Sequence, residues 1–600
     1  MPAWLHALPD WLRHRFSDNQ RFLILCTVAG VCCGLAAVAF HLSIEWTFHT
    51  VWEMAVSLGP VWFWIVMPLL PAVGGLLVGL CLWKLSPESA GSGIPQTKAA
   101  FYNDFGQMKI KDGFFRFLLG TIYIGFGNAL GREGPTVHMC ASIASKLGQW
   151  AGLAKARVQA MVPVGMGAGI AAAFNAPLSA IFFVFEELLA DFSTKALGGI
   201  VIAVVVAAAV SRSILGEDPV LQVGLREEDI VTAWWMLISL PLGIASGFIG
   251  ALFVNTLIKV RGSLRQWDGM AVWLKPAAGG LAMGLVGAAA FAFTGLFGEA
   301  QNGVFSIGYN SLELAFEAKL VGAVLIGLFI FKFIAVLICY ATGGSGGLFS
   351  PTLFLGGMLG GLFGVVLVYV HNQFGFFNLP DEREVIGACV LLGMGAMFAA
   401  IVRCPITSLV IIFEMTRNYS FILPLIAGNM IAYFISAKQR ALPLYDSLLI
   451  QDGVTLRKMP NYQGVRDYQN LPISTIMTHD TVAVDGSLNS QQNLDKLERT
   501  HHGYPVLKAD GSLCGMIMHH ELLEHVEHGI DTPLAELLKE QKVISVNPDT
   551  SIRNVAALLI KEDVLQVPVV SQKEDSKLLG IVTLHDIARQ QNTITEQVGR

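Results

Sequence analysis

The chain has 600 residues, of which 54% are hydrophobic and only 14% are charged, with a formal net charge of −5. Soluble globular proteins carry about 25% charged residues, so this composition excludes a chain built mostly of soluble domains. It also argues against a nucleic-acid-binding protein, which would present a basic patch or stripe. The composition therefore predicts a polytopic membrane protein.

The charged residues are unevenly distributed. Residues 451–600 contain 20 acidic and 14 basic residues, whereas residues 1–450 contain 25 acidic and 26 basic residues. This break predicts a domain boundary near residue 450. The expected parts are an N-terminal cytoplasmic segment (1–20), a membrane domain (21–450), a linker (451–470) and two soluble units (471–530 and 531–600).

The membrane domain begins after a polar segment in which Arg13, Arg15 and Arg21 cluster ahead of the first apolar run. The positive-inside rule places such an N-terminus in the cytoplasm. Several apolar runs reach the roughly 20 residues that a membrane-spanning helix needs, so we expect an all-α domain. The nine cysteines show no CxxC spacing, which favours reduced, packed thiols over a disulfide or zinc framework. The apolar runs are 22–43, 61–83, 161–189, 196–214, 232–258, 272–296, 320–341, 352–371, 385–413 and 421–437.

An internal repeat runs through the membrane domain. Residues 174–188 read FNAPLSAIFFVFEEL and residues 402–416 read VRCPITSLVIIFEMT, so that Pro177 and Pro405 each precede a glutamate by nine residues. Gly/Pro-interrupted segments at corresponding places in two halves are typical of transporters with a midplane substrate site. We therefore expect broken helices and a repeat that is inverted.

The last 150 residues change to alternating strands and amphipathic helices, which is a soluble α/β pattern. Two similar units each contain the order strand, helix, strand, turn, strand and helix. The paired strands are predicted at YPVL and GMIM in the first unit and at VPVV and GIVT in the second.

Four motifs occur in order in the membrane part: GSGIP at 91–95, GREGP at 131–135, GGLFSP at 346–351 and PLYDSLL at 443–449. Together they resemble the CLC family of chloride channels and chloride/proton exchangers. The paired soluble units resemble a tandem CBS module, a common cytoplasmic part of that family. The resemblance implies a homodimer with a separate pathway in each subunit, embedded in a bacterial inner membrane with both termini in the cytoplasm.

Anion binding inside a membrane requires donors of partial positive charge, because a tightly pairing cation would not release the ion. Helix N-termini and hydroxyl groups meet this requirement. By resemblance, Ser92, the backbone amides of Leu348 and Phe349, and the phenol of Tyr445 bind chloride. Without the resemblance, GSGIP would be interpreted as a tight helix break and Tyr445 as an interfacial aromatic residue.

Two glutamates are candidates for proton coupling. A carboxylate such as Glu133 in an apolar, Gly-rich break is costly and is therefore a functional hypothesis. Glu133 corresponds by resemblance to the external gating glutamate of the family, and Glu187 to its internal proton-transfer glutamate. For Arg132 we keep two interpretations, an electrostatic role toward anions and a structural salt bridge. Glu187 is alternatively part of a solvated helix end.

The second soluble unit contains GIVTLHDI, in which Thr583 and Asp586 resemble the nucleotide-binding positions of CBS modules. The first unit has Met518 and Glu521 at the matching positions. The sequence thus predicts one adenine-nucleotide site, with a purely structural module as the alternative. No metal and no required cofactor are implied.

The function that we expect is secondary active chloride/proton antiport without enzymatic catalysis. The main alternative is a passive, voltage- or pH-gated chloride channel of the same fold. A membrane-embedded enzyme would need a catalytic dyad or metal triad, which the motifs do not provide. A fluoride exchanger is disfavoured by Ser92 and Tyr445, since that branch departs from both motifs.

Overall fold

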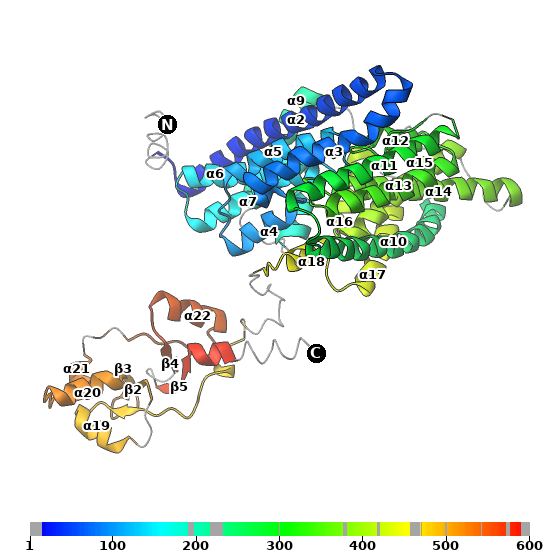
Figure 1. The fold of residues 1–600 in the computed structure, drawn as a ribbon. Coiled ribbons are helices and arrows are strands. Elements are labelled where there is room, and N and C mark those ends of the chain that lie inside the picture. Colours follow the sequence, from blue (N-terminus) through cyan, green and yellow to red (C-terminus); the bar gives the residue numbers. More distant parts are fainter. Residues whose placement is uncertain are drawn as a thin grey trace. The chain divides into compact units, whose positions relative to one another are not determined.

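The computed structural model (Figure 1) describes residues 15–189, 197–216, 232–298, 300–375, 381–416, 421–456, 469, 471–497, 501–539, 541, 543–571 and 577–589. The chain forms two compact units that divide between Met459 and Pro460. The first unit is helical, and the second combines short helices with small sheets.

Nine of the described helices are long and apolar enough to cross a bilayer. Together with the composition, they make the protein an integral, multi-pass membrane protein, as the sequence predicted. The nine are α2 (Asp18–Ser57), α3 (Pro60–Lys84), α7 (Lys155–Phe174), α9 (Leu197–Leu215), α10 (Thr232–Gln266), α11 (Lys275–Gly295), α13 (Gly322–Ala341), α14 (Phe349–Phe374) and α15 (Glu382–Ile401).

Shorter helices lie between and after these spans, and three of them carry the candidate site residues Glu133, Glu187 and Tyr445. They are η1 (Pro87–Ser89), α4 (Ile94–Asn103), α5 (Ile110–Gly125), α6 (Glu133–Trp150), α8 (Pro177–Phe183), η2 (Val184–Leu189), η4 (Val272–Leu274), α12 (Tyr309–Phe316), α16 (Pro405–Thr416), α17 (Ile422–Gln439) and α18 (Leu444–Gln451).

Two apolar runs of the sequence are broken at matching places. After α7 the backbone turns at Asn175, which has a φ of 53°, and α8 begins with Pro177. After α15 it turns at Arg403, with a φ of 67°, and α16 begins with Pro405. Proline is well suited to the first helical turn, where its missing N–H would have no partner. The predicted broken helices are therefore confirmed.

The two broken segments cap each other. The Glu186 carboxylate accepts hydrogen bonds from the amides of Ile406 (3.0 Å) and Thr407 (2.7 Å) at the start of α16. The Glu414 carboxylate accepts from the amides of Leu178 (2.8 Å) and Ser179 (2.7 Å) at the start of α8. Because the end of each segment lies at the start of the other, the equivalent segments run antiparallel, as an inverted repeat requires.

Small residues allow close helix contacts in the membrane unit, for example where α3 crosses α11. A Cβ atom on Gly284 would lie 2.1 Å from the carbonyl oxygen of Pro68, and one on Gly75 would lie 2.2 Å from that of Pro276. Glycines spaced four residues apart bring two helix backbones together in membranes. All nine cysteines are free thiols, as expected.

The second unit contains the paired strands that the sequence predicted, but the strand expected at the start of the second repeat is reduced to a single bridge between Val546 and Val569. In the first repeat, β2 (Gly503–Leu507) pairs with β3 (Leu513–Met518) antiparallel and with β1 (Val484–Asp485) parallel. In the second repeat, β4 (Gln566–Val570) pairs with β5 (Leu578–Thr583) antiparallel. The helices are α19 (Ser490–Lys496), α20 (His519–Glu527), α21 (Leu534–Leu537) and α22 (Ile552–Lys561), with a short turn η8 (Ile473–Thr475).

Candidate functional site

Three glycine-rich loops from distant parts of the sequence meet inside the membrane unit. The amide of Gly91 donates to the carbonyl of Gly344 (3.0 Å), and the amide of Gly346 donates to the carbonyl of Gly91 (3.3 Å). Gly131 and Gly347 exchange two backbone hydrogen bonds of 2.8 and 2.6 Å. The GSGIP, GREGP and GGLFSP motifs are therefore brought together at one place.

Each of these loops leads directly into a helix. α4, α6 and α14 start at Ile94, Glu133 and Phe349. The first amides of a helix have no partner within the helix and carry partial positive charge, which favours an anion. Glycine is needed for the close approach, since a Cβ atom on Gly134 would lie 2.4 Å from the Ser92 hydroxyl oxygen.

Two of the predicted chloride-binding side chains have unpartnered hydroxyl groups. Ser92 and Tyr445 are both fully buried, and neither hydroxyl has a hydrogen-bond partner in the described part of the protein. Tyr445 lies on α18, which packs against α4, the helix that begins after Ser92. A buried hydroxyl group without a partner is costly, so both residues fit a site at which a bound anion accepts their hydrogen bonds.

Glu133 is docked on the start of α14. Its carboxylate accepts hydrogen bonds from the Ser350 hydroxyl and from the Ser350 amide (3.4 Å). The hydroxyl of Tyr309 lies 3.3 Å from Glu133 Oε1 and 2.8 Å from Ser350 Oγ. Glu133 is fully buried, so these donors replace the water that an ionised carboxylate would otherwise bind. The sequence analysis missed Tyr309 and Ser350.

Arg132 lies beside the docked carboxylate. One of its Nη atoms donates to the carbonyl of Ala173 (3.2 Å), while Nε and the other Nη atom have no partner among the described residues. It lines a cavity of about 700 Å³ together with Tyr309 and Ser306. No carboxylate within the described ranges forms an ion pair with Arg132, so the structural salt bridge is not seen there, and the electrostatic role toward anions stays a prediction.

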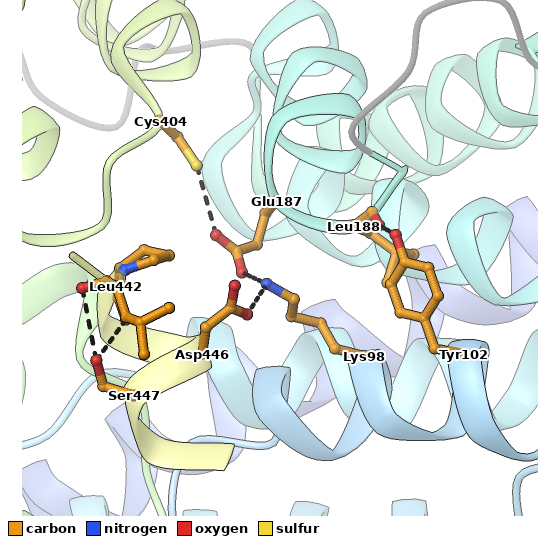
Figure 2. A network of polar contacts seen from close by, with 9 residues as sticks. Lys98, Tyr102, Glu187, Leu188, Cys404, Leu442, Asp446 and Ser447 are labelled. Carbon is orange, nitrogen blue, oxygen red and sulfur yellow. Dashed lines mark hydrogen bonds and ion pairs between the residues drawn. The ribbon is translucent and has the colours of Figure 1, made fainter. Parts of the chain in front are cut away.

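Glu187 belongs to a buried ionic cluster (Figure 2). Lys98 Nζ lies 2.6 Å from Glu187 Oε1 and 2.6 Å from Asp446 Oδ1. The Cys404 thiol donates to Glu187 Oε2 at 3.6 Å. Glu187 is only 6% exposed, so the alternative of a solvated helix end is wrong. Lys98 and Asp446 were not predicted from the sequence.

Tyr445 stands next to Asp446 on α18, and Asp446 shares the Lys98 ammonium with Glu187. Four predicted side chains thus share one region: Ser92 and Glu133 at the paired loops, Tyr445 on α18, and Glu187 on η2.

Comparison with known proteins assigns the family. Residues 74–437 match the voltage gated chloride channel family, and residues 473–528 and 534–592 match the CBS domain. The chain belongs to the voltage gated chloride channel family. It is therefore a member of a transport family, and its second unit carries two CBS domains.

Relatives and solved structures of this family are similar along most of the membrane unit. The H(+)/Cl(−) exchange transporter ClcA of Salmonella paratyphi A is 30% identical over 478 residues, which cover 77% of this chain and 94% of that protein. A slow cyanobacterial Cl−/H+ antiporter is 26% identical, with a TM-score of 0.63 over 72% of this chain and 97% of that one. A eukaryotic CLC transporter, 20% identical, shares the fold over 95% of this chain and 98% of that one, with a TM-score of 0.59.

In the CBS pair of this family member, the two predicted nucleotide-binding residues contact each other. The Thr583 hydroxyl and amide both donate to Asp586 Oδ2, at 2.7 and 2.9 Å, and the Asp586 amide donates to Thr583 Oγ1 at 3.1 Å. This arrangement is a reciprocal helix cap. In the first repeat the Met518 amide donates to Glu521 at 2.7 Å. The nucleotide site stays a prediction.

Proposed function

We propose that the protein is a secondary active antiporter that moves chloride across the membrane in exchange for protons. The observation that carries this proposal is the presence of two buried carboxylates in the same unit as the unpartnered hydroxyl groups of Ser92 and Tyr445: Glu133 at the loop junction and Glu187 in the ionic cluster. The names of its relatives, an H(+)/Cl(−) exchange transporter and a Cl−/H+ antiporter, support the same activity.

Chloride is held by neutral donors in this proposal. The hydroxyl groups of Ser92 and Tyr445 and the amides of Leu348 and Phe349 each donate one hydrogen bond to the ion. Leu348 and Phe349 stand at the start of α14, where the amides have no helical partner. Donors without full charge attract the ion and still allow it to leave.

Glu133 couples the anion to the proton because its carboxylate accepts hydrogen bonds from the same kind of donors, hydroxyl and amide groups, as chloride does in this proposal. Ionised, it docks on the start of α14 and competes with chloride for positive potential. Protonated, it loses the charge that holds it there, and chloride takes its place. Arg132 raises the potential for anions in the adjoining cavity. Glu187 supplies the proton from the other side of the site.

The test is reconstitution of the purified protein in liposomes with an imposed chloride gradient while internal pH is recorded. Antiport moves protons uphill; a passive channel carries chloride with a reversal potential that ignores the proton gradient. We expect Glu187→Gln to abolish proton movement and to leave chloride flux, since glutamine cannot carry a proton. Liposomes without protein are the control. Chloride flux without uphill proton movement in the wild type would overturn the proposal in favour of the channel.

Five further properties belong to the same proposal. We expect a homodimer with one pathway per subunit, in a bacterial inner membrane, with both termini in the cytoplasm. The CBS pair is expected to bind one adenine nucleotide at Thr583 and Asp586. Ser92 and Tyr445 favour chloride over fluoride as the transported anion.

A further inference from the structure

A fully buried lysine on α13 lies beside the loop that leads into α12. Lys332 is 0% exposed. Its Nζ atom donates to four backbone carbonyl oxygens of this loop, those of Gly303 (3.0 Å), Val304 (3.2 Å), Ser306 (2.8 Å) and Ile307 (3.2 Å). We propose that Lys332 is a positioning residue for Glu133, on which it acts through this loop and Tyr309. This inference rests on the proposed function, in which docked Glu133 competes with chloride.

The loop needs these contacts because it is buried without regular secondary structure. Residues 303–307 are all buried and form only turns and bends between α11 and α12. A buried carbonyl group without a hydrogen-bond partner is unfavourable, and the loop has no helical or strand ladder to provide one. The ammonium group of Lys332 has three N–H donors and no acceptor, so carbonyl oxygens are suitable partners for it. Lys332 therefore fixes the course of the loop.

The other side of the loop is attached to the turn just ahead of the GREGP motif. The Ser306 amide donates to the carbonyl of Gly127 (2.9 Å) in that turn. Ser306 has a φ of 51°, in the left-handed region that a serine rarely adopts. Such a conformation persists only where the surrounding contacts hold it. The loop is thus held by Lys332 on one side and by Gly127 on the other.

A glycine joins the loop to Tyr309. Gly308 precedes Tyr309, the first residue of α12, and has a φ of 88°. A Cβ atom on Gly308 would lie 2.2 Å from the carbonyl oxygen of Gly303, which is one of the four that Lys332 binds. α12 therefore starts in direct contact with a group that Lys332 fixes, and a shift of that group moves Tyr309.

Tyr309 contacts the docked carboxylate. Its hydroxyl lies 3.3 Å from Glu133 Oε1 and 2.8 Å from Ser350 Oγ. α14, which carries Ser350, packs against both α12 and α13 (Figure 1). The Phe354 ring, one helical turn after Ser350, lies 5.0 Å from Lys332 Nζ. Lys332 thus contacts both elements that meet at Glu133, the loop before α12 and the first turns of α14.

Lys332→Met tests this role through chloride binding. The variant lacks the donors that hold the loop, so Tyr309 is free to leave the docked carboxylate, which then loses one hydrogen bond. One such bond changes the occupancy of the docked state about fivefold. We expect chloride to bind about fivefold more tightly to Lys332→Met, measured by calorimetric titration of the purified full-length protein at one fixed pH. In a Tyr309→Phe background the same substitution should change the Kd by less than about twofold, because the two changes act through one bond.

Two more variants complete the design. Lys275→Met is the matched control, since Lys275 in the same unit donates to the carbonyl of Leu264 (2.7 Å) at the start of α11, and its removal should leave the Kd unchanged. Gly308→Ala keeps Lys332 and its charge but forces the start of α12 away from the Gly303 carbonyl. It should tighten chloride binding like Lys332→Met, again only while the Tyr309 hydroxyl is present. Gly308→Ala decides if Lys332→Met does not fold.

The outcomes separate positioning from other roles of the lysine. Weaker chloride binding to Lys332→Met would mean that Lys332 acts through its positive charge, and equal tightening with and without the Tyr309 hydroxyl would also overturn the proposal. Amide hydrogen exchange over residues 303–312 should rise in Lys332→Met and not in Lys275→Met. Unchanged exchange overturns the proposal whether or not the protein binds chloride. A wild type that binds no chloride contradicts the proposed function, while the exchange measurement still decides on Lys332.

Discussion

The docked state of Glu133 makes a quantitative prediction for Tyr309→Phe. The Tyr309 hydroxyl lies 3.3 Å from the Glu133 carboxylate and 2.8 Å from the Ser350 hydroxyl that donates to it. A hydrogen bond of this kind contributes about 1 kcal/mol net. Its removal therefore lowers the occupancy of the docked state by about fivefold. Because Glu133 competes with chloride, we expect chloride to bind about fivefold more tightly to the variant.

The assay is calorimetric titration of chloride into the purified full-length protein at one fixed pH. The matched control is Tyr123→Phe, since Tyr123 is also fully buried and donates at 3.3 Å, but to the carbonyl of Cys339. A second control places Tyr309→Phe in a Glu133→Gln background, where no competing charge is left and chloride affinity should not change. An unchanged Kd in Tyr309→Phe, or an equal shift in the Glu133→Gln background, would refute the reasoning.

Three further predictions concern other parts of the molecule. Ser92→Ala removes one donor and should weaken chloride binding by about tenfold in the same titration; an unchanged Kd would exclude Ser92 from the site. Glu414→Gln weakens the cap on α8 and should cost about 1 kcal/mol, measured by thermal unfolding in detergent, with proton coupling kept; lost coupling with unchanged stability would contradict a structural role. Asp586→Ala should abolish binding of radiolabelled ATP to the full-length protein; a wild type that binds no ATP would leave the CBS pair purely structural.

The sequence predicted the features whose physical causes are local. Proline after a left-handed residue ends one helix and starts another, so the breaks before Pro177 and Pro405 follow from a few neighbouring residues. The strands of the CBS pair follow from alternation in the same way. Glu133 was recognisable because a carboxylate between glycines has no solvated helix face to occupy.

The ionic cluster could not be predicted in this way. Lys98 and Asp446 are 348 residues apart, and each stands in a short helix with other polar residues, where a charged side chain normally faces solvent. Only the packing of α18 on α4 buries Lys98. Only the π-helical turn of η2 directs Glu187 toward Lys98, while the neighbouring Glu186 caps α16. The adjacent residues Glu186 and Glu187 thus have different partners because of contacts between distant segments, which no local sequence pattern indicates.

The two functional glutamates differ in the nature of their partners, and this difference fits their proposed roles. Glu133 is held by hydroxyl and amide groups, which bind chloride equally well, so an anion is able to replace it. Glu187 is held by an ammonium group at 2.6 Å. Chloride could replace Glu187 on this ammonium only by leaving a buried carboxylate unpaired. Glu133 is therefore suited to exchange with the anion, and Glu187 to exchange only a proton. In this proposal a membrane domain of nearly neutral overall charge needs no excess of basic residues to transport an anion, because the donors proposed for chloride are neutral.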